Sequence, residues 1–145
     1  MSVRPVLVYD GDCGFCRLWV ERGRALTGDR VEYAPSQSAA SRFPSVKAEA
    51  FAEAVHFFEP GGRSSRGAEA VFRAMAAAGG AAALPARLYA ALPPFADLSE
   101  AVYRFIAARR PLFSRATRLL WGASVVPAPL ARTRRLFLAA LGTCY

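Results

Sequence analysis

The hydrophobic pattern of the chain begins with a run that predicts a buried strand. Residues 6–9 (VLVY) are continuous in apolar side chains, whereas a half-exposed strand would alternate apolar with polar positions. Two more segments rich in β-branched and aromatic residues, 30–35 (RVEYAP) and 54–58 (AVHFF), also predict strands. The Pro-Gly-Gly sequence at 60–62 predicts a turn, so we expect a hairpin partner strand at 63–66.

Segments with helical spacing follow these strands. In the segment that begins at Cys16, the pattern places Leu18, Trp19 and Leu26 on one face, and we expect Trp19 to lie in the core. Residues 66–80 predict a further helix that ends in a glycine pair.

The last helices follow an alanine-rich stretch that prolines interrupt. Asp97 and Glu100 have the spacing of a capping box, which predicts a helix from Asp97 to about Arg110. Another helix is expected to start at Pro111 and to end at Gly122.

This order of elements predicts an α/β sandwich with one central sheet. We divide the chain into residues 1–96, a domain with the sheet; 97–122, a helical extension packed on or beside it; and 123–145, a proline linker with a basic amphipathic tail.

Charge is distributed unevenly and draws attention to the tail. The 145 residues carry a net charge of +8, yet residues 101–145 hold eight arginines and no acidic residue. A solvated basic face or a surface for anionic lipid or an acidic partner would both account for this. Because the arginines interleave with apolar residues, we favour an interfacial helix with Arg132, Arg134 and Arg135 at lipid headgroups, and nucleic acid is not an expected partner.

The cysteines indicate a compartment and a chemistry. Three cysteines are too few for a secreted disulfide framework, and the N-terminus does not resemble a signal peptide. We therefore expect a cytoplasmic protein, at most peripheral to the inner face of a membrane. In that setting a Cys-x-x-Cys pair is catalytic or metal-binding more often than structural.

The pair Cys13 and Cys16 stands where the first strand gives way to a helix. Unpaired N–H groups and the helix dipole favour a thiolate at Cys13, which would attack a disulfide, and Cys16, one turn later, would resolve the mixed disulfide. Gly14 lets the backbone bend between them, and Phe15 can shield the buried sulfur.

Three charged neighbours act on this pair. Asp10 and Asp12 oppose a thiolate at Cys13, although a carboxylate such as Asp10 can also take a proton from the resolving thiol. Arg17, on the first turn, could offset the two carboxylates. The sequence does not fix the sign of this balance.

Three other interpretations stay open at this point. A zinc site wants four ligands, and only His56 and Cys144 remain, singly and far away. A phosphatase of the haloacid-dehalogenase type would use the Asp-x-Asp that follows the strand, but it needs a paired acidic motif and a later lysine, for which only Lys47 is present. The cysteines could also be inert core residues. His56 is expected to be an ordinary sheet residue.

The stretch YDGDCGFC (residues 9–16) resembles the signature of the DCC family, bacterial thioredoxin-like proteins regarded as thiol-disulfide oxidoreductases. Asp10, Cys13 and Cys16 match the residues that give the family its name. The likeness covers nearly all of residues 3–122 and continues through three segments: YAPSQS (33–38), GAEAVFR (67–73) and AVYRFIAARRPLFSRATRLLWG (101–122).

This resemblance implies a thioredoxin-like three-layer sandwich with a central mixed sheet and a C-terminal helical appendix. It also implies disulfide exchange by Cys13 and Cys16 on a protein or small-molecule disulfide, without a bound cofactor or metal. Two departures from thioredoxin concern the substrate: Asp12 replaces an aromatic residue, and no proline directly precedes residues 54–58, where thioredoxins hold the substrate backbone with a cis-proline.

Residues 127–142 resemble the entry into the first membrane helix of lipase-maturation-factor-like proteins, to which such domains are sometimes fused. About ten apolar residues follow Arg135, fewer than the ~20 that span a bilayer. The alternative function is therefore a non-catalytic accessory module of thioredoxin fold that docks on a membrane or a partner through its basic C-terminal helices.

Overall fold

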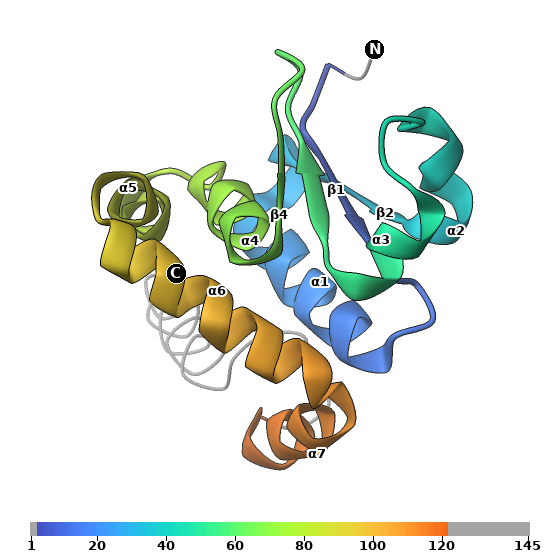
Figure 1. Ribbon diagram of the computed structural model, residues 1–145, viewed down its shortest axis with the longest axis vertical. Coiled ribbons are helices and arrows are strands. Elements are labelled where there is room, and N and C mark those ends of the chain that lie inside the picture. Colours follow the sequence, from blue (N-terminus) through green and yellow to red (C-terminus); the bar gives the residue numbers. More distant parts are fainter. Residues whose placement is uncertain (1–2, 122–145) are drawn as a thin grey trace, which may run out of the picture.

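The computed structural model describes residues 3–121, in which four short strands form one mixed sheet (Figure 1). The strands are β1 (Val6–Tyr9), β2 (Glu32–Pro35), β3 (His56–Phe58) and β4 (Ser64–Arg66), in the order β2-β1-β3-β4. β1 pairs in parallel with β2 and antiparallel with β3, and β3 pairs antiparallel with β4. All four predicted strands, including the hairpin, are therefore confirmed.

Helices cover both faces of the sheet, which gives three layers. Leu7 and Tyr9 of β1 point into a core shared with α1 (Gly14–Thr27) and α4 (Gly67–Ala76). Val6 and Val8 point to the opposite face, and the short helices α2 (Ser36–Ala39) and α3 (Ala48–Glu53) close that second core. Figure 1 shows α1 and α4 on one side of the strands and α2 and α3 on the other. The predicted thioredoxin-like α/β class is confirmed.

Single 3-10 turns link several of these elements. They are η1 (Gly28–Arg30), η2 (Ala40–Arg42) and η3 (Gly80–Ala83).

Three further helices, α5 (Leu84–Ala91), α6 (Pro93–Ala108) and α7 (Arg110–Trp121), continue the chain. α5 occupies the proline-interrupted stretch in which we predicted no element. α5 and α6 pack on α4, and α7 contacts α1 and α6. The junction of α6 and α7 thus lies at the same end of the molecule as the start of α1 (Figure 1).

The predicted capping box at the start of α6 is wrong. α6 begins at Pro93, where a proline loses no helical hydrogen bond, so Asp97 and Glu100 lie inside the helix. The Glu100 carboxylate instead accepts the backbone N–H of Glu69 at 3.2 Å, in the first turn of α4.

The predicted inner face of α1 is also wrong, because Trp19 and Leu26 are 46% and 48% exposed. The buried positions of the helix are Val20 and Thr27, each one residue after the expected Trp19 and Leu26, so the buried face is rotated around the helix axis. The Thr27 hydroxyl is satisfied by Gly23 O at 2.9 Å and lies 3.1 Å from the hydroxyl of Tyr33.

Gly23 explains why the helix turns this face inward. A Cβ at Gly23 would lie 2.8 Å from the Tyr33 hydroxyl, so the missing side chain makes room for β2. Trp19 stays at the surface, where the Arg22 guanidinium lies 5.0 Å from its ring centroid.

His56 is a buried residue of β3, as the sequence predicted. Its Nδ1 bonds Ala54 O at 3.1 Å, and its ring meets Phe51 edge-on at 5.0 Å between centroids. Burial lowers the pKa of His56 below its ordinary value of 6.5.

The protein is therefore expected to lose stability as the pH falls through the unfolded-state pKa of about 6.5 toward the lower pKa of His56 in the folded protein. In that interval the unfolded chain takes up a proton on His56 and the folded chain does not, and the loss levels off below the folded-state pKa. Urea unfolding across this range measures the effect. His56→Gln is the control, because the chain has a single histidine, and an equal pH dependence in that variant would contradict the assignment.

No helix within residues 3–121 is long and apolar enough to cross a bilayer. The predicted tail, with Arg132, Arg134, Arg135 and Cys144, lies outside the described residues.

Candidate active site

Cys13 is the N-cap of α1, so its sulfur lies at the positive end of that helix. After β1 ends at Tyr9, a turn closes through the bond from Cys13 N–H to Asp10 O at 3.2 Å. The Cys13 Sγ accepts the backbone N–H of Cys16 at 3.2 Å. This donor would stabilise a thiolate more than a thiol, since hydrogen bonds to an ionised acceptor are stronger.

Cys16, on the first turn of α1, lies in a different environment from Cys13. It is half-buried and packs against the core cluster that contains Leu7 and Phe57. Burial raises the pKa of Cys16 to about 12, helped by a hydrogen bond with the Cys13 side chain and by the charges of Cys13 and Asp10. Cys16 therefore stays a protonated thiol at neutral pH.

The two aspartates of the turn converge on Gln37, at the start of α2. Gln37 Nε2 donates to Asp10 Oδ1 at 3.1 Å and to Asp12 Oδ2 at 3.2 Å, while its Oε1 accepts Gly11 N–H at 3.1 Å. Asp10 Oδ1 also accepts the N–H of Asp12 at 3.1 Å. These donors share the negative charge of the turn, which weakens its opposition to a thiolate at Cys13.

The sequence analysis missed Gln37, although it lies within the family-like segment YAPSQS. Gly11 marks how closely this side chain approaches, because a Cβ there would lie 2.7 Å from Gln37 Oε1.

Gly14, Phe15 and Arg17, which the sequence predicted to support the dithiol, belong to the first turn of α1. Gly14 is the first residue of α1, and exposed Arg17 donates its backbone N–H to Cys13 O at 3.0 Å. Within residues 3–121, the Arg17 side chain forms no ion pair with either aspartate. Phe15 meets Trp19 edge-on at 6.2 Å, and its shielding of Cys16 stays a prediction.

Two residues of the helical extension reach the segment just before β3. The hydroxyl of Tyr103 accepts Val55 N–H at 3.0 Å, and Arg110 donates to Ala52 O at 3.0 Å and to Glu53 O at 2.8 Å. The Arg110 charge lowers the pKa of Cys16. Burial raises the pKa of Tyr103, and the Cys16 charge adds to that rise.

The analysis of the sequence missed both residues, although they fall in the family-like stretch 101–122. The described residues contain no cis peptide bond.

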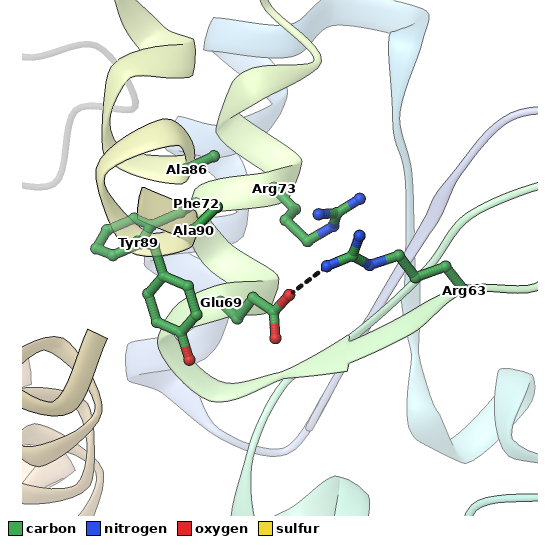
Figure 2. A pocket seen from close by; sticks show the side chains of 7 residues that line it. All are labelled: Arg63, Glu69, Phe72, Arg73, Ala86, Tyr89 and Ala90. Atoms are coloured by element: carbon green, nitrogen blue, oxygen red, sulfur yellow. Dashed lines mark hydrogen bonds and ion pairs between the residues drawn. The ribbon is translucent and has the colours of Figure 1, made fainter. Parts of the chain in front are cut away.

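A pocket of about 270 Å³ on the other side of α4 has no part in this site (Figure 2). Phe72 and Tyr89 form its aromatic wall, and Arg63 pairs with Glu69 at 3.0 Å across it. No cysteine lines this pocket, and its arginine charges are matched by glutamates, because Arg73 also pairs with Glu59.

Metal ligation finds no support in the described part of the chain. No group of three or more His, Cys, Asp or Glu side chains there is close enough to hold an ion.

A dithiol at the N-terminus of a helix, just after a central strand of a mixed sheet, is the arrangement expected of a thiol-disulfide protein. A family model described as DCC1-like thiol-disulfide oxidoreductase matches residues 7–116. The chain belongs to this family, which supports a general redox role with thiol or disulfide substrates. No curated protein and no solved structure matches the chain.

Proposed function

We propose that the protein is a thiol-disulfide oxidoreductase in which Cys13 is the attacking thiol and Cys16 the resolving thiol. The observation that carries this proposal is the asymmetry of the pair. The Cys13 sulfur accepts a backbone N–H at the helix start, whereas Cys16 is held protonated with a pKa of about 12.

The exchange proceeds in two steps that balance. The Cys13 thiolate attacks one sulfur of a disulfide, and the other sulfur leaves as a thiolate that takes up a proton. Cys16 then loses its proton and attacks the Cys13 sulfur, which releases the second thiol. Two electrons have reached the substrate, and the protein holds a Cys13–Cys16 disulfide until a cellular thiol reduces it.

Asp10 is the proposed acceptor of the Cys16 proton. Its charge already acts on Cys16, where it raises the pKa, so the two groups are within electrostatic reach. A carboxylate that accepts this proton offsets part of the free-energy cost that burial adds to the ionisation of Cys16 in the resolving step.

A redox titration tests the proposal. We expect a Cys144→Ser protein, which keeps Cys13 and Cys16, to lose two hydrogens in a single two-electron transition across a series of dithiothreitol and glutathione redox buffers, followed by mass spectrometry. A midpoint near about −270 mV would indicate a reductant, and one near about −120 mV an oxidant. A protein that forms no intramolecular disulfide at any buffer ratio would contradict the proposal and leave the accessory-module alternative.

A further inference from the structure

A groove of about 410 Å³ lies between the segment before β3, the start of α4 and the helices α6 and α7. Three arginines line the groove. Arg66 is the last residue of β4, Arg104 lies on α6, and Arg110 begins α7. The volume falls in the range typical of small-molecule sites.

Several observations connect the groove to the dithiol. Val8 of β1 pairs in antiparallel register with His56 of β3, so the end of β1 that leads to the dithiol turn lies beside the start of β3, two residues after the groove-lining Ala54. Cys16 and Val55 pack against the same core cluster. Arg110, a lining residue, also acts electrostatically on Cys16.

The positive charges of this groove are not neutralised from within. Arg66 and Arg104 pair with no carboxylate among residues 3–121, and Arg110 donates to two backbone carbonyls. Two carboxylates line the groove. Glu100 accepts the backbone N–H of Glu69 at the start of α4, so its charge interacts with that helix end. The second is the exposed Glu53, whose charge repels an anion.

The main-chain groups of the segment before β3 are already bonded. Val55 N–H donates to Tyr103, Val55 O accepts Gly67 N–H at 3.1 Å, and the carbonyls of Ala52 and Glu53 accept from Arg110. An extended peptide would have to displace these bonds to add itself to the sheet. Recognition by charge in the groove requires no such displacement.

We propose that this arginine-lined groove binds the carboxylate of a low-molecular-weight disulfide while Cys13 attacks one of its sulfurs. The inference rests on the proposed function, whose substrate class it names. The chemistry is the exchange described above: one acidic disulfide and the reduced Cys13–Cys16 dithiol give two carboxylate-bearing thiols and the oxidised Cys13–Cys16 pair.

Three small disulfides of different charge test it: oxidised glutathione (acidic), hydroxyethyl disulfide (neutral) and cystamine (basic). For each, the rate constant for oxidation of the reduced protein is measured in the parent and in each variant. We expect Arg66→Gln and Arg104→Gln each to lower the rate with oxidised glutathione about five-fold, with no change for hydroxyethyl disulfide. Higher salt should reduce this difference.

Glu53→Gln should act in the opposite direction and speed the reaction with oxidised glutathione. Arg87→Gln is the matched control, because Arg87 is an exposed arginine of α5 outside the groove. Equal losses for all three disulfides, or an effect of Arg87→Gln as large as that of Arg66→Gln, would overturn the inference. If an acidic decapeptide disulfide reacts faster than oxidised glutathione, the substrate is a peptide rather than a low-molecular-weight disulfide, and the inference is wrong.

The outcomes also separate the inference from the proposed function. If the protein exchanges with all three disulfides without any dependence on charge, the proposed function stands and the arginine-lined groove is not a site for acidic disulfides. A protein that reacts with none of them fails the proposed function itself.

Discussion

Replacing Cys16 with serine is expected to stop the reaction after its first step. The Cys13 thiolate of this variant still attacks a disulfide, but no second thiol lies beside it to release the substrate half. The mixed disulfide should therefore accumulate to near the full amount of protein, in a Cys144→Ser background, under oxidising buffer. Mass spectrometry of the intact protein measures the added substrate half.

Replacing Cys13 with serine should instead leave little mixed disulfide. The remaining Cys16 thiol is expected to react with disulfides at least about tenfold more slowly than Cys13 does in the Cys16→Ser variant. Burial, the largest cause of the raised pKa of Cys16, remains in this variant, whereas the contributions of Cys13 are removed. A thiol with a raised pKa is ionised less at neutral pH, and its greater nucleophilicity recovers only about half of that loss on a logarithmic scale. Equal trapping through either cysteine would refute the assigned roles.

The sequence predicted the sheet and the position of the dithiol because both depend on local signals. A continuous apolar run such as residues 6–9 is buried on both faces, and the structure places Val6 and Leu7 in separate cores. The Asp-Gly-Asp sequence after Tyr9 predicts a turn, and the helical spacing that follows predicts the helix that begins at Gly14.

The inner face of α1 could not be predicted from hydrophobicity alone. The helix face with Gly23 and Thr27 packs against Tyr33 of β2. Thr27 gives the Tyr33 hydroxyl a hydrogen-bond partner, and the missing side chain of Gly23 leaves room for the Tyr33 ring. Trp19 loses little at the surface, where Arg22 covers its ring. The steric fit of the helix to β2, the next strand along the chain, therefore determined which helix face is buried, against the hydrophobic pattern.

The surroundings of the dithiol were missed for a related reason. Gln37, Tyr103 and Arg110 come from segments far along the chain, and none belongs to a motif with an evident chemical meaning. Only the folded chain brings the junction of α6 and α7 beside the start of α1. The helical extension thus contributes directly to the electrostatics of Cys16, through Arg110.

The core below the dithiol links the stability of the fold to the state of Cys16. Phe57 of β3 is 2% exposed and pairs with Leu7 in the cluster against which Cys16 packs. Its neighbour Phe58 points to the other face, where it is half-buried and stacks on Phe43 at 3.8 Å between centroids. The two residues therefore form a matched pair, adjacent in sequence and different in burial.

Phe57→Ala is expected to lower the free energy of unfolding by about 3–5 kcal/mol, a large part of the total for a domain of this size. Phe58→Ala should cost about half as much, because its ring is already partly in water. Urea denaturation measures both losses, and equal values would contradict the central place of Phe57.

The milder Phe57→Leu substitution should leave the protein folded and lower its free energy of unfolding by about 1–2 kcal/mol. Because burial is the largest cause that raises the pKa of Cys16, looser packing below it should lower that pKa and speed its alkylation by iodoacetamide at pH 8. The rate is measured in a Cys13→Ser, Cys144→Ser background, with Phe58→Leu as the control. If both leucine variants leave the alkylation rate of Cys16 unchanged, the packing of this core does not determine the reactivity of the thiol.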